Sequence, residues 1–349
     1  MASYYFRAVH VRSRLEHPKT MPCIFCPSER NLTDEHVFPA FMGGELEVRK
    51  GSCNRCNAAF GVAEAALKEA TTPLLNLLKI KNRKGTVPNV PVNADIRGLD
   101  MKSLPAFMDG GGQIQLQDCV TESQTADGKI IRHGFFLTKK GGETFIERAQ
   151  AKGAKVIERK VPGEIVIDTN YTLTTPFAFS LPARKVAAKI ALAAIALEYG
   201  IPFALSPEFD SARQARTATG DKDLRVWIFA NEGLMGAFGR TAHQHSVMCY
   251  LSAQWRKGWA VVTLFGGLTY RVDVATDYTG REKCFGIYYD AVLKKRINPV
   301  ILADEKTLIG HVLSPATTFE DREAVDEQWY PILSRYCAEK GIEVERIGR

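Results

Sequence analysis

The stretch CIFCPSERNLTDEHVFPAFMGGELEVRKGSCNRCN, residues 23–57, determines how the N-terminal part of this chain folds. It contains two Cys-x-x-Cys pairs that are separated by 26 residues. Each pair can form a tight knuckle with two thiolates, and two knuckles complete the tetrahedral coordination of one Zn²⁺ ion. A redox disulfide motif normally stands alone beside a βαβ pattern, whereas two pairs lie close together here. The spacing therefore predicts a structural zinc site at Cys23, Cys26, Cys53 and Cys56.

The segment between the two cysteine pairs carries polar residues beside a predicted hairpin. Glu35 and His36 precede a short apolar segment, and Gly43-Gly44 suit the tight loop of a hairpin. After Asn57 the sequence AAFGVAEAALKEA is rich in Ala, Leu and Glu, which favours a helix. We expect the hairpin, the knuckles and the helix to hold Glu35, His36 and Asn57 around one small cavity.

The segment from Cys23 to about Leu67, an eighth of the chain, resembles the HNH endonuclease superfamily, the ββα-metal nucleases. It is most similar to the branch that combines C-x-x-C, E-H-x-x-P, G-G and C-x-x-C-N in this order. The resemblance implies a zinc-braced ββα-metal module at the N-terminus of an α+β protein.

The resemblance also implies a role for each polar residue. His36 would be the general base that takes a proton from the attacking water, and Glu35 and Asn57 would supply oxygen ligands to a catalytic divalent metal. Mg²⁺ and Mn²⁺ suit carboxylate, amide and water ligands. Hydrolysis of a phosphodiester needs such a set, because a base must activate water while a cation neutralises the leaving oxygen.

The chain departs from the family pattern at three positions. Glu35 stands where the wider superfamily often has Asp, Val48 replaces the middle Asn of the family name, and Ala58 follows Asn57 where many relatives carry a basic residue. The basic side chains that remain nearby are the expected phosphate contacts: Arg49, Lys50 and Arg55.

Length and composition are those of an ordinary globular protein. With 349 residues, 45% hydrophobic and 24% charged residues, the chain is expected to form two or three domains. The formal net charge of +7 fits a nucleic-acid partner without requiring one. The other four cysteines are scattered, which indicates reduced thiols in the cytoplasm, and we expect no signal peptide and no membrane span.

The predicted domain order starts with an N-terminal arm at residues 1–20 and a nuclease module at residues 21–80. A basic, Pro-containing linker at residues 81–95 and an α+β domain at residues 96–349 follow. In the module, the helix that continues from Glu64 to Lys81 is expected to be interrupted at Pro73.

The larger domain is expected to be built around one apolar helix. Ser180 and Gly200 bound an Ala-rich sequence with a Pro near its start. Arg184, Lys185 and Lys189 lie near the N-terminal turns, where the helix dipole does not favour cations. An anionic ligand would explain them, but solvent-facing charges on a core helix are the commoner explanation.

The last third of the chain is expected to be a set of antiparallel strands with a terminal helix. Gly266-Gly267 marks a hairpin turn, and the helix over 318–339 is expected to break near Pro331. His243 and His245 have the spacing of metal ligands on one strand face, but without an acidic neighbour in the sequence they predict no second metal site. The predicted strands are 224–230, 245–251, 259–265, 268–274 and 284–292.

The resemblance therefore implies a metal-dependent HNH endonuclease that hydrolyses phosphodiester bonds, with DNA as the expected substrate. Bacterial relatives with this arrangement commonly act in defence or restriction, so this context is expected by association. The larger domain would select the substrate, sense a small-molecule activator or mediate assembly of a homo-oligomer. The alternative is a zinc-knuckle module that binds nucleic acid without cleaving it.

Overall fold

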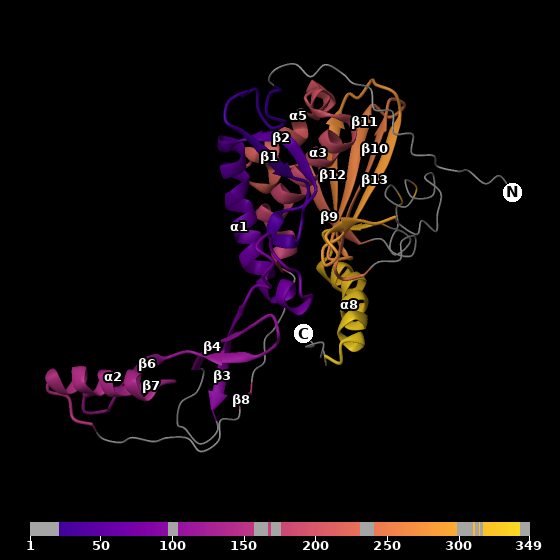
Figure 1. Ribbon diagram of the computed structural model, residues 1–349. Helices are drawn as coiled ribbons and strands as arrows, with labels where there is room; N and C mark the ends of the chain where they lie inside the picture. Colours follow the sequence, from indigo (N-terminus) through magenta and orange to yellow (C-terminus); the bar gives the residue numbers. More distant parts are fainter. Residues whose placement is uncertain are drawn as a thin grey trace.

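The computed structural model describes residues 21–96, 104–156, 167–168, 176–230, 241–298, 310, 314 and 317–342. The N-terminal segment of residues 1–20, predicted to be a separate arm, lies outside this part of the chain. Within it, three regions can be told apart (Figure 1): an N-terminal module, a projecting arm and a body built on a large sheet. We use "module" for residues 23–77, "arm" for residues 90–168 and "sheet body" for residues 176–342, in each case for the described residues only.

The module is a hairpin followed by a helix. Strands β1 (Leu32–His36) and β2 (Glu47–Cys53) pair antiparallel, with Glu35 opposite Val48, and α1 (Asn54–Leu77) begins directly after Cys53. This ββα order confirms the expected module. The second cysteine pair therefore lies at the junction of β2 and α1, where a bound metal would join strand to helix.

Helix α1 is continuous through Pro73, so the expected interruption is wrong. Pro73 lies in the last turns of the helix and removes one backbone donor there. Leu74, Leu75 and Leu77 are buried after it, and their packing keeps this end of the helix in place. Burial of three leucines outweighs the loss of one hydrogen bond.

The sheet body contains a seven-stranded antiparallel sheet in the order β14-β13-β10-β11-β12-β9-β15. The predicted strands are confirmed with small changes at their ends, and the β11–β12 turn contains Gly266 at a φ of 71°. The strands are β9 (Val226–Ala230), β10 (Gln244–Ser252), β11 (Lys257–Leu264), β12 (Leu268–Thr276), β13 (Lys283–Asp290), β14 (Lys295–Arg296) and β15 (Thr318–Phe319).

Helix α3 (Leu181–Tyr199) is the central element of the molecule. The Ser180 side chain caps it by accepting a hydrogen bond from the Ala183 N–H, and it ends at Gly200, as expected. It contacts the strands of the sheet on one side and α1 on the other (Figure 1). This confirms the apolar core helix.

The prediction that the cationic side chains of α3 face solvent is wrong for two of them. Arg184 is 7% exposed and Lys189 is 2% exposed, whereas Lys185 is half-buried. Arg184 pairs with Glu320 at 2.8 Å and donates to the Val226 carbonyl at 3.2 Å. The sequence pattern could not show this, because these partners come from other strands and loops.

Helix α8 (Arg322–Glu339) closes the sheet body beside β9. It runs through Pro331 without a break, and the segment before it forms β15, so both details of the predicted 318–339 helix are wrong. The Trp329 indole N–H donates to the Phe265 carbonyl at 3.2 Å and anchors the helix. The short helices are η1 (Ala40–Met42), η2 (Pro176–Phe179), α4 (Ile201–Ala204), η3 (Pro207–Phe209), α5 (Asp210–Arg213), η4 (Gln214–Arg216) and η5 (Asp221–Asp223).

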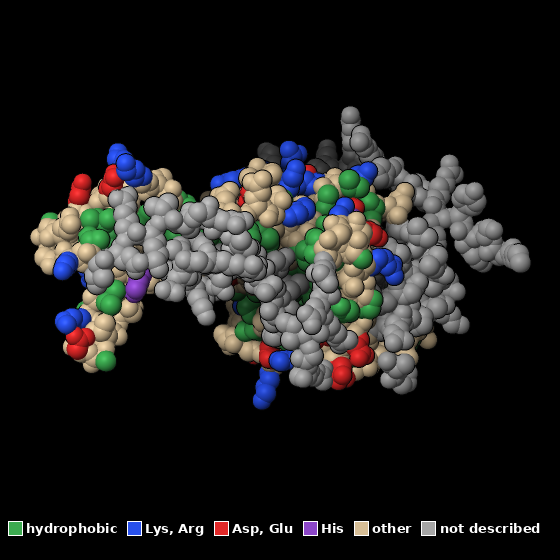
Figure 2. Space-filling view, turned by 90° about the horizontal axis from the view of Figure 1, so that it is seen from below, with side chains coloured by type: hydrophobic (Ala, Val, Ile, Leu, Met, Phe, Trp, Pro, Cys, Tyr) green, Lys and Arg blue, Asp and Glu red, His purple; other side chains and the backbone are tan. Residues whose placement is uncertain are grey.

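The arm projects from one end of the molecule and has a small core of its own (Figure 1). Asn76 at the end of α1 is fully buried and donates to the carbonyls of Pro88, Met108 and Asp109, which holds the base of the arm. Figure 2 shows hydrophobic side chains at the surface of the arm. Its elements are β3 (Val90–Ile96), β4 (Leu104–Met108), β5 (Ile114–Leu116), β6 (Cys119–Gln124), β7 (Ile130–Phe135), α2 (Lys139–Ala151) and β8 (Ile167–Asp168).

The module and the sheet body share one hydrophobic core. Buried residues from Ile24 and Phe38 in the module to Tyr289 and Cys337 in the sheet body form a single cluster. The segment expected to be a linker, residues 81–95, ends in strand β3, and the division of the chain into domains stays a prediction. Among the described helices, none has the length and apolar character that crossing a membrane requires.

The loop between β1 and β2 is fixed against the sheet body. The Tyr289 hydroxyl donates to the Gly43 carbonyl at 2.8 Å and accepts from the Glu45 N–H at 3.1 Å. Gly43 has a φ of 81°, and a Cβ atom there would lie 2.6 Å from the Ala291 carbonyl oxygen. This glycine is needed both for the backbone conformation and for the close approach of the two parts.

Gly43→Ala should therefore lower the free energy of unfolding by at least about 2 kcal/mol, from the left-handed backbone and the clash together. Gly85→Ala is the matched control, because Gly85 has a φ of 78° and open space around it. Urea unfolding of both variants separates the two causes. Equal losses would show that the contact with Ala291 contributes nothing.

Candidate active site

The four cysteines of the two Cys-x-x-Cys pairs come together in one cluster. Their Sγ atoms all lie within 4.8 Å of one another, and Cys26 Sγ and Cys53 Sγ are 3.6 Å apart. A tetrahedral zinc ion with Zn–S bonds of about 2.3 Å needs sulfurs roughly 3.8 Å apart. Three of the cysteines are buried and Cys26 is half-buried. The tetrad therefore fits a closed structural zinc site.

The surroundings act differently on the thiols of the tetrad: burial raises the pKa of Cys23 and of Cys56, whereas the pKa of Cys53 is lowered. Burial opposes ionisation of Cys53, but hydrogen bonds from the Cys56 backbone and from neighbouring thiols lower the pKa of Cys53 to about 7. Arg216, from η4 of the sheet body, donates to Cys56 Sγ at 3.6 Å. Four thiolates on one Zn²⁺ carry two negative charges, which this guanidinium offsets in part.

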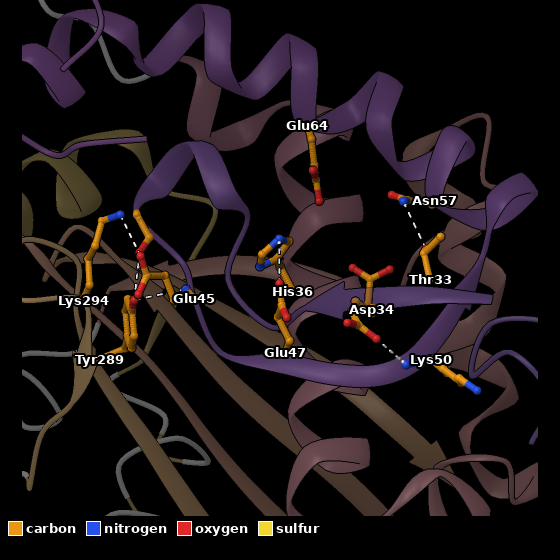
Figure 3. A network of polar contacts seen from close by, with 12 residues as sticks. Thr33, Asp34, His36, Glu45, Glu47, Lys50, Asn57, Glu64, Tyr289 and Lys294 are labelled. Atoms are coloured by element: carbon orange, nitrogen blue, oxygen red, sulfur yellow. Dashed lines mark hydrogen bonds and ion pairs between the residues drawn. The ribbon is translucent and has the colours of Figure 1, made fainter. Parts of the chain in front are cut away.

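His36 lies at the end of β1, beside the loop that is fixed to the sheet body. Its Nε2 is 3.3 Å from Glu47 Oε1, and its Nδ1 is buried without a hydrogen-bond partner among the described residues (Figure 3). Burial lowers the pKa of His36; Glu47 acts against this, and the charges of Lys189 and Arg83 add to it. The imidazole is therefore neutral at neutral pH and can accept a proton.

Glu35 is enclosed at the centre of the site. Its side chain is 2% exposed, its Oε1 is 2.5 Å from Lys189 Nζ, and its Oε2 is buried without a hydrogen-bond partner in the part of the chain that the structure describes. Burial raises the pKa of Glu35 against the charge of Lys189.

Lys189 also contacts Glu64 of α1, and burial works against its charged form. The two carboxylates outweigh burial and raise the pKa of Lys189, so the ammonium stays charged. One lysine of α3 thus binds carboxylates from two elements of the module, β1 and α1.

Asn57 lies on the first turns of α1, over β1. Its Nδ2 donates to Thr33 Oγ1 at 3.5 Å (Figure 3). Thr33 Oγ1 in turn donates to the Ser52 carbonyl at 3.1 Å. Asn57 is exposed, in contrast to Glu35. The predicted residues are therefore on neighbouring elements, but their joint use as metal ligands stays a prediction.

The three predicted phosphate contacts are exposed on the outer side of the module. Arg49 and Lys50 are on β2 and Arg55 is at the start of α1. The Lys50 backbone N–H donates to Asp34 Oδ1 at 2.8 Å. The Lys50 side chain points away from the hairpin (Figure 3). Their exposure is compatible with binding to an anionic surface, and their role stays a prediction.

Part of the chain matches a known protein-family model. The family model described as HNH endonuclease matches residues 23–68, which contain the tetrad, β1, β2 and residues 54–68 of α1. We therefore call residues 23–68, which are similar to this family, the HNH domain. Searches of curated proteins and of solved structures gave no match. The HNH domain supports a nuclease-type function and a nucleic-acid substrate in general terms.

The HNH domain is braced without the middle Asn of the family name. Val48, which stands at that position, is buried and lies opposite Glu35 in the hairpin. The Val37 N–H donates to the Leu46 carbonyl at 2.8 Å, and Tyr289 binds the loop from the sheet body. Backbone pairing within the hairpin and the hydrogen bond from the sheet body thus hold this loop.

Sequence reasoning missed Lys189, Glu64 and Arg216 as neighbours of the HNH site. The one signal in the sequence is that Lys189 is a cation near the N-terminal turns of an apolar helix, where the helix dipole does not favour it. Glu64 and Arg216 gave no signal, because each looks like an ordinary charged residue of a helix or turn. Their proximity to the site depends on how α1, α3 and η4 pack together.

The donor set also fits a divalent metal in the HNH domain. Glu35 Oε2 is a hard oxygen ligand that has no hydrogen-bond partner among the described residues, and the amide of Asn57 is of the same ligand class. His36 stands beside Glu35 with one buried nitrogen free of a described partner. A carboxylate, an amide and an imidazole of this kind suit Mg²⁺ or Mn²⁺ chemistry.

His243 and His245 do not form a metal pair. His245 accepts from the Phe265 N–H at 3.2 Å through Nδ1, so its Nε2–H donates to the Met42 carbonyl at 3.3 Å. His243 lies outside β10 and its Nε2 is 3.1 Å from Asp290 Oδ2. His245 instead links the sheet body to the loop of the HNH domain.

Burial lowers the pKa of His245 to about 4, against its ordinary value of 6.5. The unfolded chain takes up a proton near pH 6.5 and the folded chain resists it, so stability should fall between pH 6.5 and about 4. The loss should reach about 3 kcal/mol. Urea unfolding at several pH values measures it. The free energy of unfolding should depend less steeply on pH in His245→Asn than in the wild type. His133→Asn, in the exposed part of the arm, should keep the pH dependence of the wild type. Equal slopes in all three proteins would contradict this role.

Proposed function

We propose that this protein is a metal-dependent HNH endonuclease that hydrolyses phosphodiester bonds in DNA. The observation that carries the proposal is the pair Glu35–His36 at the end of β1, where a carboxylate oxygen and an imidazole nitrogen are both buried without a described partner. Buried polar atoms without partners are rare in folded proteins and point to a missing ligand or water. The cysteine tetrad keeps this pair in place by joining β2 to α1.

In this reaction His36 takes a proton from the attacking water. Its neutral ring, favoured by burial, is the form that can do so, and its position next to Glu47 orients the imidazole. Glu35 and Asn57 would hold a divalent ion, Mg²⁺ or Mn²⁺, which stabilises the negative charge on the phosphate and the leaving oxygen when it is bound. Arg49, Lys50 and Arg55 would contact the phosphate backbone from the exposed side of the domain.

DNA rather than RNA is proposed because the resemblance to HNH endonucleases implies it. The site itself recognises a phosphodiester and does not read a nucleic-acid base. A role in bacterial defence or restriction follows from the same association. The sheet body and the arm would then select the substrate, respond to a small-molecule activator or mediate assembly. The arm is a reasonable candidate for such contacts, because it carries exposed hydrophobic side chains: Val120, Ile130, Leu137 and Val156.

The test is cleavage of supercoiled and linear DNA, and of RNA, by zinc-loaded protein with Mg²⁺, Mn²⁺ or EDTA. Cleavage that requires the divalent ion and is abolished by EDTA supports the proposal. Binding of DNA without cleavage under any metal would favour the alternative, a zinc-knuckle module that only binds nucleic acid. RNA cleavage in place of DNA cleavage would correct the substrate.

A further inference from the structure

The strongest unexplained feature of the HNH domain is the lysine that enters it from outside. Lys189 belongs to α3, more than a hundred residues after the domain, and is 3% exposed in its side chain. It bonds one oxygen of Glu35 and one oxygen of Glu64. Both oxygens therefore face a single cationic nitrogen, which is how two carboxylates are arranged around a bound cation.

The charges at this point do not balance. Two carboxylates against one ammonium leave one negative charge in a site where Glu35 is almost fully buried. An uncompensated charge in such a place is costly, and a bound cation removes the cost. The orphaned Oε2 of Glu35 lies on the same carboxylate and is a second sign that a ligand belongs there.

Glu64 is the member of the group that solvent can reach. Its side chain is 21% exposed, whereas those of Glu35 and Lys189 are nearly enclosed. In Figure 3 it extends from α1 toward the hairpin that carries His36. It lies two turns after Asn57 on the same helix, so an ion entering from solvent would meet Glu64 before Glu35.

We propose that Glu35 and Glu64 are paired carboxylate ligands of the divalent ion, and that the ammonium of Lys189 occupies their shared site in the metal-free protein. The ammonium and a small divalent ion, with metal–oxygen distances of about 2.1 Å, require similar room between two carboxylates. Lys189 thus keeps the two ligands together and competes with the metal. This inference takes the divalent ion from the proposed function and adds Glu64 and Lys189 to its site.

The test measures Mn²⁺ binding to the zinc-loaded full chain in the absence of nucleic acid. Electron paramagnetic resonance of free Mn²⁺ gives the affinity. Glu64→Gln removes one charged ligand and should weaken Mn²⁺ affinity at least tenfold. Lys189→Met removes the competing charge and should strengthen Mn²⁺ affinity at least tenfold. Mn²⁺ should also raise the thermal midpoint of Lys189→Met by more than it raises that of the wild type.

Matched controls come from the same two helices. Glu69→Gln changes an exposed carboxylate of α1, and Lys185→Met removes a lysine of α3 whose Nζ bonds only the Ala218 carbonyl among the described contacts. Neither should change Mn²⁺ affinity. Glu64→Gln keeps the one-to-one pair of Glu35 and Lys189, so it tests the ligand assignment even if Lys189→Met does not fold.

Unchanged Mn²⁺ affinity in Glu64→Gln would overturn the inference, as would unchanged or weaker affinity in a folded Lys189→Met protein. The result is separate from the proposed function. Mn²⁺ binding that depends on Glu64 in a protein that never cleaves DNA would uphold this site while the nuclease proposal fails. Metal-dependent cleavage with Mn²⁺ affinity insensitive to Glu64 would overturn this inference alone.

Discussion

His36→Ala should reduce the rate of metal-dependent DNA cleavage by about 10³-fold while the protein stays folded and keeps its zinc. A positioned general base typically contributes 10²- to 10⁴-fold, and no other imidazole in the described part of the HNH domain is available to replace it. The side chain is 19% exposed, and among the described residues it contacts the carboxylate of Glu47, so its loss should leave the hairpin intact. Nicking of supercoiled plasmid under single-turnover conditions measures the effect.

His133→Ala is the control for this variant. His133 is an exposed histidine of the arm and contacts Ser123, far along the chain from the HNH domain. It should cleave at the wild-type rate, and both variants should contain one zinc per chain. Cleavage by His36→Ala at a rate near that of the wild type would refute the assignment of the base.

Loss of the zinc site should have the largest effect on stability. Cys53→Ser removes a buried ligand at the junction of β2 and α1, and structural zinc sites of this kind contribute on the order of 10 kcal/mol to folding. Because the HNH domain shares its core with the sheet body, the effect should extend beyond the hairpin. We expect the thermal midpoint to fall by more than about 10 °C.

Scanning calorimetry with zinc analysis tests this expectation. Cys284→Ser is the matched control, because Cys284 is exposed on β13 and lies outside the tetrad. It should keep both the zinc and the thermal midpoint. A zinc-free Cys53→Ser protein that melts at the wild-type temperature would show that the tetrad has no structural role.

Local chemistry made much of the HNH domain predictable. Two Cys-x-x-Cys pairs can satisfy one tetrahedral ion only if they meet, and the apolar segment with Gly43-Gly44 indicated the hairpin between them. The boundaries of α3 followed from Ser180 and Gly200, whose capping roles depend on neighbouring backbone atoms alone. The breaks expected at Pro73 and Pro331 are absent, because packing of α1 and α8 keeps both helices continuous.

The chain sequence thus determined the cysteine tetrad, the Glu35–His36 pair and the apolar helix, since each depends on residues close together in the chain. Tertiary packing added Lys189 and Arg216, which meet the HNH domain across 125 and 160 residues, respectively. A hydrophobic pattern shows that a helix is buried but not which charges its few polar side chains meet. That depends on long-range contacts, and these contacts are what place a lysine of α3 between two carboxylates of the HNH domain.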